Sequence, residues 1–179
     1  MPAGEAQGYL PAARAFHWVT AALVLTMLPI GIAMANADFG AAQDTLYHIH
    51  RSIGVLLLPI ALARLYYRWR HPAPPLPDDV PPMQRMAAQT VHWALYAILI
   101  VQPVIGWIAT SAYRAPILFF WMFEVPPIWP VDQKFSESMF QIHRALGIIM
   151  AILICAHIGA ALYHHFIRKD RILMRMVSG

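Results

Sequence analysis

Three stretches of this chain contain no Asp, Glu, Lys or Arg, and their length limits the possible folds more than any other feature. They are Ala15–Ala37, Met86–Tyr113 and Ala145–Ile167, of 23, 28 and 23 residues. An α-helix needs about 20 consecutive apolar residues to cross the hydrocarbon core of a bilayer. Hydrophobic residues make up 59% of the sequence and charged residues 12%, which is more apolar surface than a soluble domain of this size can bury. The sequence therefore predicts a protein that spans a membrane.

A fourth span is expected between the first two of these stretches. Only Ser52–Ala63 is free of charge there, but Arg51 and Arg64 at its borders can extend their side chains to the membrane surface, so a longer helix can cross. We expect an all-α membrane protein in which residues 1–179 form one domain. Its four transmembrane helices are predicted at about 15–37, 47–67, 86–113 and 137–167.

Prolines mark the connections between the spans. The stretch Arg70–Pro82 is too rich in proline for a helix and predicts an extended connector. The connection Arg114–Phe135 combines four prolines with Trp121 and Trp129, which predicts a loop at the membrane interface. Prolines inside the spans predict kinks rather than breaks, because neighbouring helices can satisfy the freed backbone groups. These are Pro29, Pro59 and Pro103.

The basic residues predict the orientation. Nine Lys and Arg residues fall on the side of both termini and the proline-rich connector, and four fall on the other side. Because cytoplasmic loops carry the excess of basic residues, we expect both termini in the cytoplasm. The same residues lie scattered at the segment ends, so the net charge of +4 does not indicate binding to nucleic acid. The single Cys155 excludes an internal disulfide and a cysteine-ligated cluster or zinc site.

Four histidines form the candidate site. His143 and His157 are fourteen residues apart in the last apolar segment, which places both rings on one helix face, about 21 Å apart along the axis. His17 lies near the start of the first segment and His50 near the start of the second. Depth in the membrane therefore pairs His17 with His157 near the cytoplasmic surface, and His50 with His143 near the outer surface. Two such levels fit within a hydrocarbon core about 30 Å thick.

The neighbours of these histidines indicate what they bind. Each is followed four residues later by Ala or Gly, and a flat macrocycle lying against a helix needs that patch to be small. The small residues are Ala21, Gly54, Gly147 and Ala161. His92, His164 and His165 are followed instead by Tyr96, Arg168 and Lys169. We therefore expect His92 to be a hydrogen-bonding residue beside a ligand and not a ligand itself.

Two neutral imidazoles on facing helices suit a haem iron, which takes a nitrogen ligand on each side of the macrocycle and then transfers electrons. Zinc is the alternative, but two pairs about 20 Å apart do not form one tetrahedral site, and no carboxylate lies in a span to complete it. Arg51 and Arg144 each follow an outer histidine and could neutralise haem propionates. Both could equally be basic residues at helix ends that reach the surface.

Several segments together carry a resemblance to a known family. They are Arg14-Ala15-Phe16-His17-Trp18, His48-Ile49-His50-Arg51-Ser52-Ile53-Gly54, Pro103-Val104-Ile105-Gly106, His143-Arg144-Ala145-Leu146-Gly147, and His157 followed by His164-His165-Phe166. In order and spacing they resemble the bacterial cytochrome b561 family, from about Ala15 to Met176. The resemblance implies a multi-pass protein of the bacterial inner membrane that holds two b-type haems and exchanges electrons with ubiquinone. It places the haem ligands at the same four histidines.

The sequence leaves several electron-transfer partners as alternatives. Some members of the family resemble superoxide oxidases, which pass electrons from periplasmic superoxide to ubiquinone, so the resemblance implies an oxidoreductase. The long outer loop could instead dock a periplasmic redox or lipid-binding protein. Another alternative is a haem-containing anchor subunit that connects a separate dehydrogenase to quinone. A histidine-lined metal or proton transporter would need carboxylates within the spans, where the sequence has none.

A quinone site is expected beside one of the haems. Quinone reduction consumes protons, so the site needs protonatable groups, and imidazole titrates in the useful range. Tyr163, His164 and His165 follow His157 by about two turns, where the helix meets the cytoplasmic headgroups. We expect His164 to belong to the quinone site. The alternative is that these residues only anchor the helix at the interface.

Overall fold

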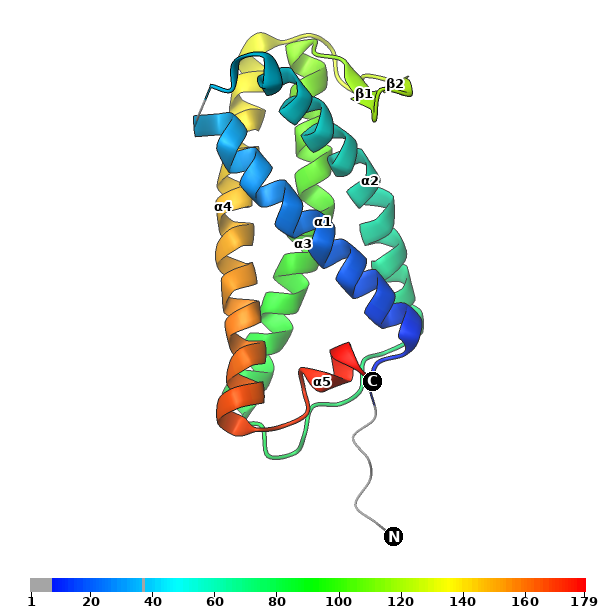
Figure 1. Ribbon diagram of the computed structural model, residues 1–179, viewed down its shortest axis with the longest axis vertical. Coiled ribbons are helices and arrows are strands. Elements are labelled where there is room, and N and C mark those ends of the chain that lie inside the picture. The colour runs from blue at the N-terminus through cyan, green and yellow to red at the C-terminus, as the bar shows by residue number, and fades with distance from the viewer. Residues whose placement is uncertain (1–7, 37) are drawn as a thin grey trace.

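Four long helices form the body of the computed structural model, which describes residues 8–36 and 38–179. They are α1 (Pro11–Asn36), α2 (Gln43–Arg70), α3 (Pro82–Tyr113) and α4 (Gln133–Tyr163), and they run alternately up and down (Figure 1). All four are long and apolar enough to cross a membrane, α4 together with the turn that follows it. The predicted all-α bundle with four membrane-spanning helices is confirmed. The helices continue without a break through the three internal prolines.

Each helix begins four residues before its predicted span, at residues 11, 43, 82 and 133 instead of 15, 47, 86 and 137. The reason is that a run without charges locates only the hydrocarbon core, whereas a helix can continue through the headgroup region with polar residues. Ala37, the last residue of the first predicted span, lies outside the described residues.

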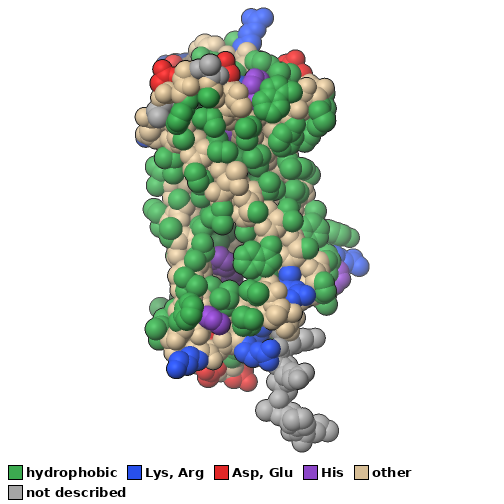
Figure 2. All heavy atoms as spheres, in the orientation of Figure 1, with side chains coloured by type: hydrophobic (Ala, Val, Ile, Leu, Met, Phe, Trp, Pro, Cys, Tyr) green, Lys and Arg blue, Asp and Glu red, His purple; other side chains and the backbone are tan. Residues whose placement is uncertain are grey.

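The two ends of the bundle carry different structures. The terminal end holds the start of α1, the proline-rich connector, the π-helical turn η2 (His164–Arg168) and the short helix α5 (Met174–Val177). The hairpin end holds the 3-10 turn η1 (Gly40–Ala42) and the antiparallel strands β1 (Ile117–Phe119) and β2 (Phe123–Val125). Figure 2 shows apolar side chains over the middle of the molecule, with Lys, Arg, Asp and Glu gathered toward both ends. This distribution fits a bilayer around the middle.

The connection predicted as a loop, Arg114–Phe135, contains the β1–β2 hairpin, which the sequence analysis did not predict. Its turn places Phe120 and Trp121 at φ values of 44° and 60°, a left-handed conformation that bulky residues rarely adopt. Ser52 of α2 holds this turn, because its buried Oγ donates to the carbonyl of Leu118 (3.0 Å) and accepts from the N–H of Phe120 (2.8 Å). The hairpin is therefore attached to the first turns of α2.

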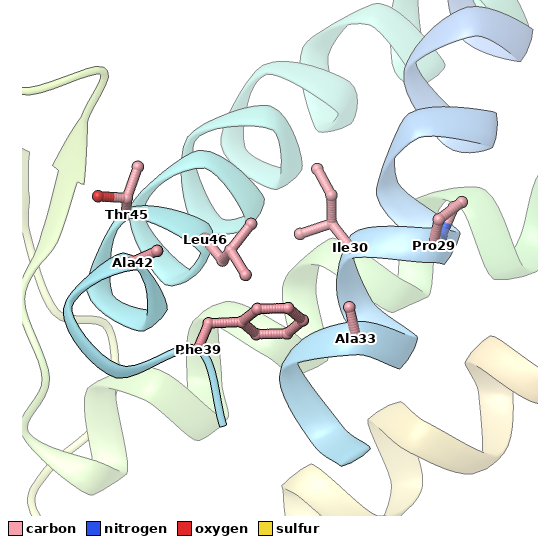
Figure 3. Close-up of a pocket in the computed structure, with 7 residues that line it drawn as sticks. All are labelled: Pro29, Ile30, Ala33, Phe39, Ala42, Thr45 and Leu46. Atoms are coloured by element: carbon pink, nitrogen blue, oxygen red, sulfur yellow. The ribbon is translucent and has the colours of Figure 1, made fainter. Parts of the chain in front are cut away.

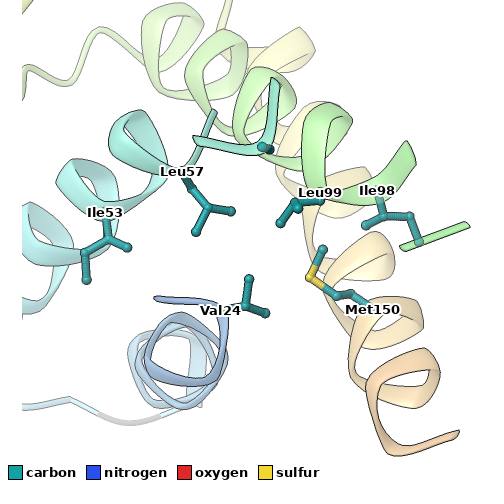
Figure 4. Packing of buried hydrophobic residues seen from close by; sticks show 7 residues of the cluster. Val24, Ile53, Leu57, Ile98, Leu99 and Met150 are labelled. Atoms are coloured by element: carbon teal, nitrogen blue, oxygen red, sulfur yellow. The ribbon is translucent and has the colours of Figure 1, made fainter. Parts of the chain in front are cut away.

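A layer of buried apolar side chains fills the middle of the bundle. It includes Val24 of α1, Leu57 of α2, Leu99 of α3 and Met150 of α4 (Figure 4). Met150 is seven residues from both His143 and His157 in the sequence. The apolar layer therefore separates the two levels at which histidines were predicted to meet.

Candidate functional site

The four predicted histidines meet in the two predicted pairs. The ring centroids of His17 (α1) and His157 (α4) are 6.1 Å apart, and those of His50 (α2) and His143 (α4) are also 6.1 Å apart. A bond from a metal to an imidazole nitrogen is about 2 Å long, so two imidazoles on opposite sides of one metal atom have centroids about 6 Å apart. Both pairs therefore have a separation that fits a haem iron with two axial nitrogen ligands.

Each pair reaches between helices that are not close packing partners. The closely packed helix pairs are α3 with α4, α1 with α2, and α2 with α3, whereas α4 makes few close approaches to α1 or α2. Within the described ranges, no three His, Cys, Asp or Glu side chains are grouped so that they could hold one metal ion. The nitrogen ligands available to a metal are thus pairs of imidazoles between separated helices. A flat macrocycle needs this arrangement.

Two glycines make room for the rings at the hairpin end. A Cβ atom on Gly31 would lie 3.1 Å from Cε1 of His50, and a Cβ atom on Gly106 would lie 3.0 Å from Cε1 of His143. Ordinary contacts between carbon atoms are about 3.5–4.0 Å long. Any larger residue at either position would therefore have to move a ring.

Gln102 orients His143. The backbone carbonyl of Gln102 lies 3.1 Å from Nδ1 of His143, and the Gln102 side-chain amide donates to the backbone carbonyl of His143 (2.8 Å). A carbonyl oxygen only accepts, so Nδ1 carries the proton and Nε2 keeps the lone pair that a metal ion needs. The Nδ1 atom of His50 is buried and has no hydrogen-bond partner among the described residues. A buried nitrogen without a partner is uncommon and fits a site that a ligand completes.

A third histidine lies beside the pair at the terminal end. The ring centroids of His92 (α3) and His157 are 5.2 Å apart, with the rings edge to face. This distance is shorter than the separation of about 6 Å between two ligands of one metal atom. The geometry therefore favours His17 over His92 as the partner of His157, and the role of His92 beside the ligand stays a prediction.

Arg64, which the sequence analysis expected to be able to reach the membrane surface, contacts the histidine pair at the terminal end. The structure turns Arg64 inward, where it donates to Nδ1 of His17 (2.9 Å) and lies 5.1 Å from the ring centroid of Tyr96. The imidazole acceptor and the aromatic face replace the headgroups as its partners. Because arginine only donates, Nδ1 of a neutral His17 must be unprotonated and Nε2 carries the proton. To bind a metal through Nε2, His17 must exchange this contact for another.

The two arginines predicted near the outer ligands lie at the hairpin end. Arg51 donates to the carbonyl of Pro116 (3.2 Å), and its guanidinium carbon lies 5.2 Å from the ring centroid of Tyr47. Arg144 is exposed. Their role as propionate contacts stays a prediction.

His164 pairs with a carboxylate that the sequence analysis missed. Its Nδ1 lies 2.5 Å from Oδ2 of Asp170, which also accepts from Arg168 Nε (3.3 Å), while Asp170 Oδ1 accepts from the N–H of Ile172 (3.0 Å). Burial alone would raise the pKa of Asp170, but the hydrogen bonds led by that of His164 outweigh burial and lower the pKa below its ordinary value. Asp170 is therefore an ionised partner of His164 at the terminal end.

A pocket of about 390 Å³ lies between the end of α1 and the start of α2 (Figure 3). Its lining is almost entirely apolar and contains none of the predicted site residues. The lining residues are Pro29, Ile30, Ala33, Phe39, Ala42, Thr45 and Leu46. The pocket is therefore separate from the histidine pairs.

A membrane bundle of four helices with paired interhelical histidines defines a class of protein, the membrane electron-transfer proteins that bind b-type haem. The sequence matches the family described as prokaryotic cytochrome b561 over residues 8–179, and the chain belongs to this family. It is thus a multi-pass protein of a bacterial inner membrane.

Named relatives agree with this assignment. The chain is 34% identical to cytochrome b561 homolog 2 of Escherichia coli K12 over 169 residues, which cover 92% of this chain and 88% of the relative. It is 29% identical to cytochrome b561 homolog 1 of the same organism, over 90% of this chain and 92% of the relative. It is 27% identical to a Yersinia pestis protein named "Probable superoxide oxidase CybB", over 90% of each chain.

Proposed function

We propose that residues 1–179 form one membrane domain that binds two b-type haems and carries electrons across the inner membrane, exchanging them with ubiquinone. The observation that carries this proposal is the pair of equal ring separations, 6.1 Å at each end of the bundle. His17 and His157 would ligate one haem, and His50 and His143 the other. A haem iron with both axial positions filled supplies one-electron transfer.

The residues around each pair have separate tasks in this proposal. At the hairpin end, Gln102 holds the His143 ring with Nε2 free, and Gly31 and Gly106 leave space for both rings. At the terminal end, Arg64 would leave His17 when the haem binds and would then be free to pair with a propionate. The apolar layer between the two levels keeps water and ions from entering the middle of the bundle.

The electron donor is proposed from the relative named as a superoxide oxidase. With both termini in the cytoplasm, the hairpin end faces the periplasm, where superoxide would deliver its electron. A periplasmic redox or lipid-binding protein is the alternative, and it would contact the exposed side chains of Trp121, Met122 and Phe123 on the hairpin. An anchor subunit for a separate dehydrogenase is the other alternative, in which electrons enter only from a bound partner.

The ligand assignment is tested by the optical spectrum and the haem-to-protein ratio of the purified protein. We expect two haems in the wild type. His17→Ala and His157→Ala should lose the haem of the terminal end, and His50→Ala and His143→Ala that of the hairpin end. His71→Ala is the control, because His71 is exposed and lies outside the helices. Full haem content in any of the four variants would show that assignment to be wrong.

The donor and acceptor are tested on the same preparation. Enzymatically generated superoxide should reduce the haem iron, and a short-chain ubiquinone should reoxidise the iron. Both steps are followed by the absorbance of the haem. A protein that superoxide does not reduce, but that co-purifies with a dehydrogenase able to reduce it, would favour the anchor subunit instead.

A further inference from the structure

His164 and Asp170 form an enclosed imidazole–carboxylate pair at the terminal end of the bundle. Their side chains are 13% and 14% exposed, and Nδ1 and Oδ2 lie 2.5 Å apart. An ionised carboxylate only accepts hydrogen bonds, so Nδ1 of His164 donates to it. The second ring nitrogen, Nε2, makes no hydrogen bond to the part of the chain that the structure describes. The pair therefore offers one free imidazole nitrogen whose partner nitrogen is fixed.

The backbone around the pair is built to hold it. The helix widens into the π-helical turn η2 at His164, and Lys169 then adopts a left-handed φ of 56°. These two features bring Asp170 back to His164, and the N–H of Asp170 donates to the carbonyl of His164 (3.1 Å). Single π-helical turns are rare and occur frequently at functional sites.

The position of His164 relates the pair to the proposed haem ligand. His164 follows His157 by seven residues, which returns it to within about 20° of the same helix face and about 10 Å further along the axis. His164 thus lies on the face of α4 that carries His157, between that ligand and the terminal end. His165 is turned by about 80° from His157 on the helix and lacks a carboxylate partner among the described residues.

Asp170 is the charged group with the strongest influence on the His164 ring. Arg168 of the same turn contacts Asp170, but its Nη2 also donates to Asp79 of the connector (2.7 Å). Asp79 balances the charge of Arg168, so the carboxylate of Asp170 remains as the net negative charge beside the ring. The phenol of Tyr163 is also a titratable neighbour, and its ring centroid lies 5.9 Å from that of His164.

We propose that Asp170 is a positioning residue that makes His164 the proton donor to quinone, an inference that rests on the proposed exchange of electrons with ubiquinone. Reduction of a quinone adds two electrons and two protons, and each carbonyl becomes a hydroxyl. The haem, when bound, would supply the electrons. One proton passes from Nε2 of the His164 imidazolium to the nearer quinone oxygen, and the opposite oxygen takes the second proton from water. The neutral ring then takes a new proton from water at the terminal end. Asp170 stays ionised, fixes Nδ1 as a donor and stabilises the imidazolium.

The experiment follows reoxidation of the reduced full-length protein by a short-chain ubiquinone as a function of pH. Asp170→Asn removes the charged acceptor of Nδ1, so the pH of half-maximal rate should fall. The rate at neutral pH should fall about tenfold. Asp78→Asn is the matched control, because Asp78 is an exposed carboxylate of the connector that makes no ion pair with the described residues, and its loss leaves the His164–Asp170 and Arg168–Asp79 contacts intact. Asp170→Glu keeps the charge and should keep the pH of half-maximal rate close to that of the wild type.

The outcomes separate this inference from the proposed function. An unchanged pH profile in Asp170→Asn with full haem content would overturn the role of Asp170, and an unchanged rate in His164→Ala would overturn the role of His164. If Asp170→Asn does not assemble, Asp170→Glu decides, because a large shift of its profile would also overturn the inference. A wild-type protein that quinone does not reoxidise would overturn the proposed function itself and the inference with it.

Discussion

Gly106 gives the sharpest test of the haem site that we propose at the hairpin end. A methyl group there, as in Gly106→Ala, would lie 3.0 Å from Cε1 and 3.2 Å from Nδ1 of His143. To restore ordinary contacts of about 3.5–4.0 Å, the ring must move away from α3 by roughly 0.5 Å or more. The acceptor of Nδ1 is the carbonyl of Gln102, on the same helix as Gly106, so this movement lengthens a hydrogen bond that is already 3.1 Å long.

The cost of this movement has two parts. A hydrogen bond stretched beyond about 3.5 Å is lost, which costs about 1 kcal/mol. Crowding of one extra methyl group in a packed site adds about 1–3 kcal/mol. Together these terms predict a loss of about 2–4 kcal/mol in haem affinity, which is about 30-fold to several hundred-fold.

The assay is the haem content of protein made with a limited haem supply, with the remaining haem assigned by its spectrum. Gly106→Ala should lose the same haem as His143→Ala. Gly159→Ala is the control, because a Cβ atom at Gly159, two residues after His157, meets nothing within 4 Å. Gly106→Ala protein that keeps both haems under limited supply would refute the reasoning from ring displacement.

Two further variants test the terminal end. His92→Ala should keep both haems and shift the midpoint potential of one, because His92 lies too close to His157 to share a metal atom with it; loss of one haem from a stably folded protein would show that His92 is a ligand. Arg64→Leu removes a positive charge from beside His17. At about 10 Å from the iron and an effective dielectric constant of 20, that charge contributes about 1–2 kcal/mol, so the midpoint potential should fall by roughly 40–90 mV. Arg64→Lys keeps the charge and should restore most of the potential, and an equal fall in both variants would argue against an electrostatic role.

The long helices could be predicted because their signal is the length of sequence without charge. The first turn of α4 carries a capping signal, because the carboxylate of Asp132 accepts from the N–H of Phe135. The helices α2 and α3 begin without a side-chain cap. The β1–β2 hairpin could not be predicted from the sequence. Its strands have three residues each, its turn lacks glycine, and the residue that holds it, Ser52, is 66 residues away from Leu118 in the sequence.

The histidine pairing could be predicted because depth follows from position along a helix. The surroundings of the rings could not, because they depend on how each helix is rotated about its axis. The sequence analysis pointed to Gly54 and Gly147 as small residues beside a macrocycle, and this role stays a prediction; Cβ atoms there would approach Met27 and Gln102. The glycines that contact the imidazoles, Gly31 and Gly106, are on the neighbouring helices. Asp170 was missed because it reaches His164 only through the π-helical turn.

The unequal distribution of titratable groups bears on where quinone reacts. Transfer of electrons alone needs rings held at a fixed separation, and at the hairpin end glycines and the uncharged Gln102 hold the His143 ring. Quinone reduction also needs protons at a defined place. The terminal end provides the carboxylate–imidazole pair of Asp170 and His164 about 10 Å from the level of His157, close to water and to the connector. Among the described residues, the terminal end alone pairs an imidazole with a carboxylate, and this difference supports the proposal that quinone reacts at the terminal end and electrons enter at the hairpin end.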